Sequence, residues 1–482
     1  MKILFLIFTI LLLYITVIPS SGANLSKAHR IYRISNSMKK NEKITYELLM
    51  AKYYFAAIPF AVKHLENKGK VTENFEKALR LIVLKTGTES FMNIKSKTLR
   101  DAKSNTLNFV LGLKYFERKN YKASAYFLGL IPEEHRFGPE ARMMGGSSLS
   151  MAKKFDAAAT QYKRCYNVAN SAETKAKNNK VARYYAIIKE SCLIHAARLK
   201  FTNRKFKESI DAYEEVAKKS YMWPYILLEK AWSNYHMEDY NRTLGLLVTY
   251  KYPLLKSYFL PEAEVLTALA YLKLCLWDDA LEVVKQYYSI YKPRSERLKA
   301  ILLKYKSSNT YFLELTKKNI RDSEKQNPFI RNLVTQVRKT IKYNLDFSSF
   351  KLAKNEIKRL NKAGKSSFTK MLVSKVQNII KQRKKSLNWF IKKRMFDFIN
   401  KIHRNSYEMF KIKIEIMSQK RSLLYKNTKL VSDRGRGSFE NVNRKSDQHF
   451  WEFKGSFWAD ELGEYSFGLK SNCAEIKRGR KQ

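Results

Sequence analysis

The feature that most constrains the fold of this chain is a set of five short turns that recur through its middle. In each turn a short, mostly polar stretch ends in an aromatic residue, and these are Tyr121, Phe155, Phe206, Tyr240 and Trp277. Consecutive aromatics are 34, 51, 34 and 37 residues apart, and the second spacing equals 34 plus an insertion of 17. A period of 34 residues is typical of a repeat unit made of two helices. The spacing therefore predicts a run of helical hairpins.

Small residues occupy corresponding positions on both sides of these turns. They are Gly112, Gly146, Ala197, Ala231 and Ala268 before the turns, and Ser124, Ala158, Ser209, Thr243 and Ala280 after them. Small side chains at these positions let the two helices of a unit approach closely. In its period and in these positions the chain resembles the tetratricopeptide repeat family over about residues 105–293, with five units.

This resemblance implies an α-solenoid whose first helices line a concave groove. Carried over by register, the groove positions that we expect to bind a partner are Phe109, Phe116, Arg198, Phe201, Tyr225, Trp232 and Tyr235. A groove with several rings and an arginine suits a protein partner, either an extended peptide or a helix. The alternative is that several of these rings belong to the core.

The first 23 residues have the pattern of a signal peptide. Lys2 precedes an apolar run from Ile3 to Ile18, and small residues at Ser21 and Ala23 precede the predicted cleavage site. A membrane anchor is the alternative, but the run is shorter than the roughly 20 residues that a spanning helix needs. Together with the repeats, this start looks like that of exported repeat proteins of Gram-negative envelopes. We therefore expect the chain in the periplasm or cell envelope.

A strongly basic region follows the repeats. The chain has 93 Lys and Arg against 43 Asp and Glu, a net charge of +50. Residues 294–430 alone hold 36 Lys and Arg against 9 Asp and Glu. Residues 365–434 lack Gly and Pro, and their apolar residues recur at intervals of three and four, which predicts one long amphipathic helix. The apolar stripe includes Phe368, Leu372, Val376, Leu387, Phe398, Ile402, Met409, Ile416 and Leu423.

The cations of this helix allow two interpretations. The stripe could be a coiled-coil or bundle seam with a solvated charged surface. Alternatively, a continuous cationic face could bind lipid head groups, lipopolysaccharide or an acidic wall polymer. The residues that we expect to bind such an anionic surface are Lys381, Arg383, Lys384, Lys385, Lys392, Lys393 and Arg394. Nucleic acid is not an expected partner, because the chain lacks a nucleic-acid motif and carries an export pattern.

The C-terminal region changes character after residue 430. An aromatic-rich stretch from Phe450 to Phe467 predicts a small hairpin or an extended segment, which docks either on the chain's own repeat groove or on a partner. The chain has four cysteines and no CxxC pair. Buried free thiols are the preferred interpretation of Cys165 and Cys192, the only two cysteines that we would test for a bridge.

The sequence shows no pattern of residues for catalysis. It has no HExxH, GxSxG or GxGxxG motif, so we expect no catalytic residue, no metal and no cofactor. The resulting interpretation is an all-α, non-enzymatic scaffold or adaptor, with a polyanion- or wall-binding protein as the alternative. The expected divisions are a signal peptide (1–23), a helical cap (24–104), the repeats (105–294), the basic helical extension (295–430) and the aromatic C-terminal segment (431–482).

Overall fold

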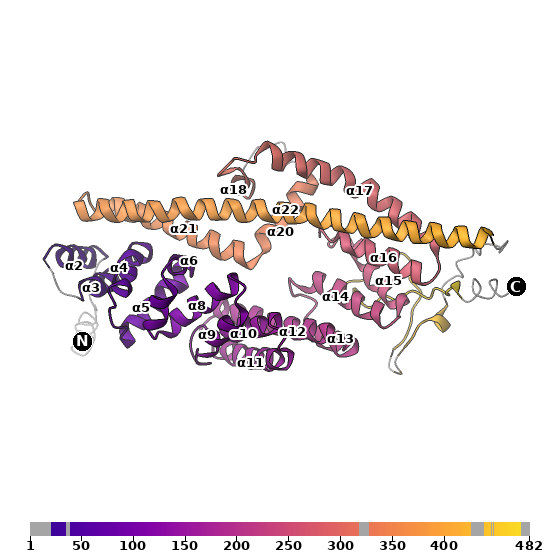
Figure 1. The fold of residues 1–482 in the computed structure, drawn as a ribbon, viewed down its shortest axis with the longest axis horizontal. Coiled ribbons are helices and arrows are strands. Elements are labelled where there is room, and N and C mark those ends of the chain that lie inside the picture. The colour runs from indigo at the N-terminus through magenta and orange to yellow at the C-terminus, as the bar shows by residue number, and fades with distance from the viewer. Residues whose placement is uncertain are drawn as a thin grey trace, which may run out of the picture. The chain divides into compact units, whose positions relative to one another are not determined.

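The computed structural model describes residues 21–34, 39–317, 327–425, 438–444, 446 and 448–473. The expected all-α fold is confirmed, because the described residues form consecutive helices and no strand (Figure 1). Most of the predicted signal peptide, the 434–437 linker and the basic tail after Cys473 lie outside the described residues. None of the described helices is both long and apolar enough to cross a membrane.

Two compact units make up the chain, and each combines distant parts of the sequence. Unit 1 comprises residues 1–152 and 341–386, and unit 2 comprises residues 153–340 and 387–482. These limits cut across the divisions expected from the sequence. In particular, residues 341–386 of the basic extension belong to the same unit as the N-terminal helices.

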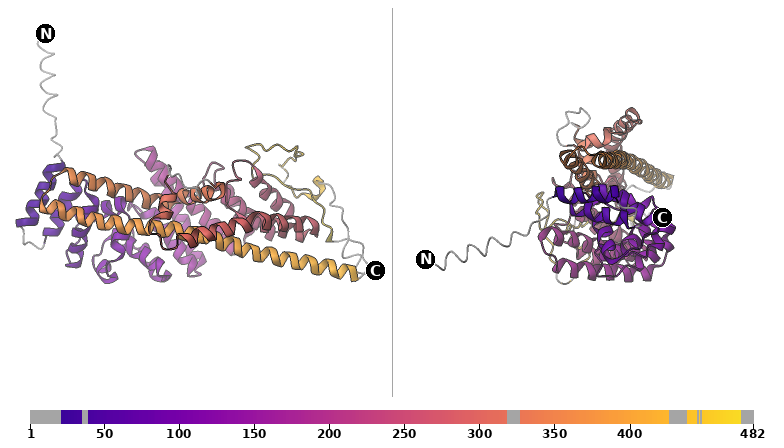
Figure 2. Two further views of the ribbon diagram at one scale, coloured as in Figure 1. Left: turned by 90° about the horizontal axis from the view of Figure 1, so that it is seen from above. Right: turned by 90° about the vertical axis from the view of Figure 1, so that its left-hand side faces the viewer.

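Unit 1 is built mainly from short helices that follow one another in the chain. They are α2 (Ser21–Ile34), α3 (Lys40–Met50), α4 (Tyr54–Glu66), α5 (Glu73–Thr86), α6 (Glu89–Met92), α7 (Ser96–Asp101), α8 (Asn105–Glu117), α9 (Tyr121–Gly129) and α10 (Gly138–Met151). The unit is completed by α21 (Ile341–Lys362) and by the start of α22 (Ser367–Tyr425). Figures 1 and 2 show α21 and this first part of α22 lying side by side.

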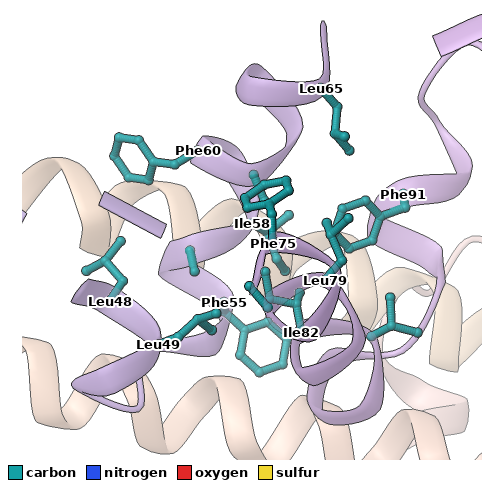
Figure 3. Packing of buried hydrophobic residues seen from close by; sticks show 14 of the residues in the cluster. Leu48, Leu49, Phe55, Ile58, Phe60, Leu65, Phe75, Leu79, Ile82 and Phe91 are labelled. Carbon is teal, nitrogen blue, oxygen red and sulfur yellow. The ribbon is translucent and has the colours of Figure 1, made fainter. Parts of the chain in front are cut away.

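The core of unit 1 joins these two parts of the sequence. Side chains of α3, α4 and α5 meet in its centre, among them Leu48, Phe55 and Ile82 (Figure 3). Phe368 and Leu372 of α22 belong to the same buried cluster. The basic extension therefore supplies part of this core.

Unit 2 continues the succession of helices. It contains α11 (Phe155–Thr174), α12 (Asn179–Thr202), α13 (Phe206–Glu214), α14 (Trp223–His236), α15 (Tyr240–Val248), η1 (Thr249–Lys251), α16 (Pro261–Lys273), α17 (Trp277–Lys304), α18 (Tyr311–Leu315) and α20 (Pro328–Lys339). From α11 to α17, each long helix packs on the one before it. The second part of α22 and the C-terminal segment, which we define as the described residues of 438–473, complete the unit.

The positions of the five predicted turns are confirmed. The second helix of each hairpin begins at the predicted aromatic residue, from Tyr121 in α9 to Trp277 in α17. Two residues before it, the backbone is left-handed, with φ between 56° and 63°. In several turns the next N–H donates to a carbonyl five residues back, as Asn120 does to Tyr115. This pattern ends the first helix and satisfies carbonyls that would otherwise lack partners.

The apolar stripe predicted on the long helix is confirmed as a buried face. Leu387, Ile402, Met409, Ile416 and Leu423 of α22 are all buried. Hydrogen bonds hold this part of α22 in unit 2, since the hydroxyl of Tyr287 in α17 donates to the carbonyl of Ile402 at 2.9 Å. The stripe is therefore a packing surface of the chain itself.

Two disulfides correct the interpretation of the cysteines. Cys165 in α11 is bonded to Cys192 in α12, so the preferred interpretation of these two as free thiols is wrong. Cys275 is bonded to Cys473 across 198 residues, a pair that the sequence analysis missed. The second bridge ties the C-terminal segment to the turn between α16 and α17.

The C-terminal segment docks on the chain's own helices. The side chain of Asn241 in α15 donates to the carbonyls of Asn441 and Leu469 and accepts from the N–H of Leu469. Gly245 lies so close to the carbonyl of Tyr465 that no side chain would fit between them. Of the two sequence-based alternatives, docking on the chain itself is thus the one observed. The contacts lie mainly on α15 and not on the predicted groove positions.

Candidate functional site

The predicted groove residues of unit 1 do not form an open surface. Phe109 in α8 is 7% exposed and belongs to the core, where its ring stacks on Phe137 at 4.6 Å between centroids. Phe109 therefore fits the alternative that some of these rings belong to the core, because its ring is already packed. Phe116 is half-buried and meets Tyr121 edge to face at 5.6 Å.

Arg198, the only charged groove residue predicted in unit 2, is engaged in an internal network. Its guanidinium donates to both carboxylate oxygens of Glu229 in α14, at 2.9 and 2.6 Å. The hydroxyl of Tyr213 donates to the same carboxylate at 2.6 Å, and burial raises the pKa of this tyrosine. Bidentate pairing fixes the guanidinium plane. Arg198 therefore links α12 to α14, and its charge is already paired with Glu229.

Beside this network, aromatic side chains of α12, α13, α14 and α15 form a continuous row. We call Phe201, Phe206, Trp232, Tyr235, His236 and Tyr240 the aromatic row. The His236 ring lies at its centre, 4.9 Å from Phe206, 6.0 Å from Trp232 and 5.8 Å from Tyr235 between ring centroids. The structure thus brings together three of the predicted groove residues, namely Phe201, Trp232 and Tyr235.

The aromatic row is partly desolvated but still reachable from solvent. All its members except the exposed His236 are half-buried. Burial raises the pKa of Tyr235 to about 12, with smaller contributions from Tyr240 and from Glu415 in α22. The indole N–H of Trp232 donates to Glu262 at 2.8 Å, which sets the orientation of its ring. Tyr225, the remaining groove residue, meets Tyr258 edge to face at 5.7 Å.

The seven predicted cations of α22 differ in their surroundings. Lys381, Lys385 and Lys393 are exposed, while Lys384, Lys392 and Arg394 are half-buried. Lys392 donates to the carbonyl of Lys306 at 2.6 Å, and Arg394 lies 3.6 Å from Asp397. The first four of the seven belong to unit 1 and the last three to unit 2.

Arg383 does not belong to the exposed cationic face. Its side chain is 5% exposed, donates to the carbonyl of Thr86 at 2.6 Å and lies 3.1 Å from Glu89. Thr86 is the last residue of α5, where carbonyls lack helical partners and carry partial negative charge. The helix end and Glu89 already use the charge of Arg383, and little of its side chain is exposed to an external anion.

Sequence reasoning missed a second apolar face on α22. Eight large apolar side chains of its second part are exposed. One is Tyr425, the last residue of the helix, and the other seven share a heptad spacing: Trp389, Phe396, Tyr407, Phe410, Ile414, Met417 and Leu424. We call these seven residues the exposed seam. Their spacings of three, four, seven and eleven residues are visible in the sequence, but the predicted apolar stripe of this helix does not include them.

The described residues include no group of three or more His, Cys, Asp or Glu that could hold a metal ion. No family model matches the chain, and a search of curated proteins finds no significant similarity. The candidate binding surfaces of the chain are the aromatic row, the exposed lysines of α22 and the exposed seam.

Proposed function

We propose that the chain is an exported, non-enzymatic scaffold of the tetratricopeptide repeat type, which binds a protein partner through the aromatic row. The observation that carries this proposal is the row itself, which presents half-buried rings from four successive helices. Protein-binding surfaces are enriched in Tyr and Trp because these residues bury much area with few rotatable bonds. The recurring 34-residue period supports assignment of the hairpins to this repeat family.

Two features support export to the periplasm or cell envelope. The first 23 residues have the signal-peptide pattern. The four cysteines form two disulfides, which persist in oxidising compartments and are rare in the cytosol.

The test is capture of a protein partner from envelope extracts by the mature chain, residues 24–482. We expect Trp232→Ala and Tyr235→Ala each to lose the partner, because these half-buried rings flank the exposed His236 at the centre of the row. Tyr126→Ala is the matched control, since Tyr126 is an exposed ring of α9 outside the row. Equal capture by all variants would refute the assignment of the row as the binding surface.

A second candidate function is binding of an anionic envelope surface by the basic extension. The observation that favours it is the exposure of Lys381, Lys385 and Lys393. Replacement of these three lysines by serine should reduce salt-sensitive binding to lipopolysaccharide or acidic wall polymer. Lys175, Lys177 and Lys180, three exposed lysines around the start of α12, provide a control with the same change in charge. Equal binding by both triple variants would assign the effect to overall charge and refute a specific surface.

These tests use substitutions because truncation would damage the fold. Removing the chain after residue 293 would take Phe368, Leu372 and Val376 out of the core of unit 1. Loss of binding by a truncated chain would therefore not separate the two functions.

A further inference from the structure

The exposed seam is an ordered second face of α22, distinct from the buried stripe. Its members are between 51% (Phe410) and 65% (Leu424) exposed. Positions 389, 396, 410, 417 and 424 are related by multiples of seven, and Tyr407 and Ile414 interleave with them. At roughly 100° per residue, positions 410, 417 and 424 lie about 100° around the helix from Met409, Ile416 and Leu423, and Tyr407 and Ile414 lie further round still. The helix therefore carries two apolar faces, and unit 2 buries only one of them.

Concentration of exposed apolar residues on one helix face indicates a binding surface. Large exposed side chains occur singly on most soluble surfaces and need no explanation, whereas a contiguous set marks an interaction site. Here seven such side chains lie within 36 residues of one helix, from Trp389 to Leu424. A partner that covers these side chains would gain on the order of 1 kcal/mol or more of binding free energy for each one that it buries.

The spacing of the seam indicates that the occupant is another helix. From Tyr407 to Met417 the intervals are three, four and three residues, which is the alternation of the two core positions of a heptad. Such a seam follows a supercoiled partner helix, because a 3.5-residue period winds slowly around an α-helix. The other core positions of the same register hold four polar residues, Lys393, Asn400, His403 and Arg421, and polar core residues can set the register and the choice of partner.

The residues that flank the seam indicate the charge of that helix. The positions next to the two core positions include five cations, Lys392, Arg404, Lys411, Lys413 and Lys420, and one acid, Asp397. Lys411 lies 2.6 Å from Glu408, and Lys420 lies 2.5 Å from Asp278. Each pair has at least one exposed partner, Lys411 in the first and Asp278 in the second, so these pairs contribute little stability. In coiled coils the flanking positions choose the partner by charge. A second copy of this chain would place cations opposite cations.

We propose that the exposed seam binds an acidic α-helix of another protein as a coiled coil. The partner helix has apolar residues at its heptad core positions and Glu or Asp at the flanking positions. This site shares no residue with the aromatic row. The proposal does not depend on the identity of the partner of the row.

The probe is a synthetic peptide of four heptads with Leu and Ile at the core positions and Glu at all flanking positions. A matched peptide carries Lys in place of every flanking Glu. We expect the acidic peptide to bind the mature full-length chain and the basic peptide not to bind. Phe410→Ser combined with Ile414→Ser should weaken binding of the acidic peptide by at least about tenfold. Both side chains are exposed, so these substitutions leave the fold intact.

Two sets of controls make the result specific. Leu303→Ser removes an exposed apolar side chain of α17 and should leave binding unchanged. Trp232→Ala should also leave it unchanged, because the aromatic row is a separate site. Lys411→Glu combined with Lys413→Glu should weaken binding of the acidic peptide and produce binding of the basic one.

Several outcomes would overturn the proposal. Failure of both peptides to bind, or equal binding by the seam variant and the wild type, would reject the seam as a helix site. Loss of peptide binding in Trp232→Ala would place the peptide on the aromatic row. Self-association in sedimentation velocity that the seam variant abolishes would identify a second copy as the occupant. Seam-dependent binding to phosphatidylglycerol vesicles, without peptide binding, would identify a lipid surface.

Discussion

Substitution of Glu356 by alanine should loosen unit 1 at the start of α4. Glu356 lies in α21 and is fully buried. One carboxylate oxygen accepts from the N–H of Phe55 at 3.1 Å, and the other accepts from the N–H of Ala56 at 2.7 Å. The first N–H groups of a helix have no partner within it, and no side chain next to α4 caps them. A carboxylate about 300 residues away in the chain therefore acts as the N-cap.

The expected loss follows from the two hydrogen bonds. A buried N–H that loses its partner costs about 1–3 kcal/mol, so two of them cost about 2–6 kcal/mol. Alanine also removes the cost of burying a carboxylate, which offsets part of that loss. We expect Glu356→Ala to lower the stability of unit 1 by about 3 kcal/mol. Glu356→Gln should cost about half as much, because its side chain accepts through one oxygen and turns an NH₂ toward the other donor.

Hydrogen exchange at individual backbone amides is the suitable measurement, because a chain with two units need not unfold in one step. The amides of Phe55 and Ala56 should exchange faster in Glu356→Ala by about a hundredfold, which corresponds to about 3 kcal/mol. Lys358→Ala, an exposed change in the same helix, is the control and should leave both amides unchanged. Wild-type exchange rates at both amides in Glu356→Ala would refute the capping role.

Three further predictions concern pH and the C-terminal segment. Burial outweighs the backbone donors and raises the pKa of Glu356 from 4.5 to about 7. The folded chain thus keeps a proton that the unfolded chain releases, so the stability of unit 1 should fall by about 3 kcal/mol as the pH rises from 4.5 to 7. Hydrogen exchange at amides of unit 1, corrected for the intrinsic pH dependence of exchange, measures this fall, which should be smaller in Glu356→Gln. Cys275→Ser removes the disulfide that joins residues 198 positions apart, and should lower the stability of unit 2 by up to about 5 kcal/mol in the chain-entropy account. Protease cleavage within the C-terminal segment should then become faster. An unchanged cleavage rate would show that the bridge does not hold this segment. Gly245→Ala places a methyl group against the C-terminal segment and should also accelerate its cleavage. Gly129→Ala is the control and should leave the cleavage rate unchanged, because its methyl group meets no atom within 4 Å. Equal cleavage rates in the two variants would contradict the docking on α15.

The parts of the fold that local patterns encode were predictable. The turns depend on a left-handed residue followed by an aromatic residue, and both lie within a few positions of each other, as at Lys119 and Tyr121. The buried stripe of α22 was predictable because apolar residues at helical spacing define one face without reference to a partner. The same reasoning could have found the exposed seam, since it depends only on spacing within one helix.

Other features depend on partners far away in the sequence, and no local pattern shows them. Glu356 is one of two acids in a lysine-rich helix, and nothing near it predicts that it caps α4. Arg383 lies in a run of cations whose other members are exposed or half-buried. The bridge between Cys275 and Cys473 joins residues 198 positions apart. The repeat register predicts that Phe109 lines the groove. Periodicity alone does not show that the ring of Phe137 stacks on the ring of Phe109.

The buried charges of α21 and α22 change how the basic extension should be understood. In unit 1 these helices give Glu356 to the N-terminal end of α4 and Arg383 to the C-terminal end of α5. Arg359 donates to the carbonyl of Lys52, just after α3. Each charge matches the sign of the helix end that it meets, so these residues stabilise the fold and do not contribute to an outward cationic face. The extension is therefore first a structural element of unit 1, and its capacity to bind external anions depends on the fewer lysines that remain exposed. A salt-dependence measurement on the intact chain should accordingly give a slope well below the one that the net charge of the region would imply.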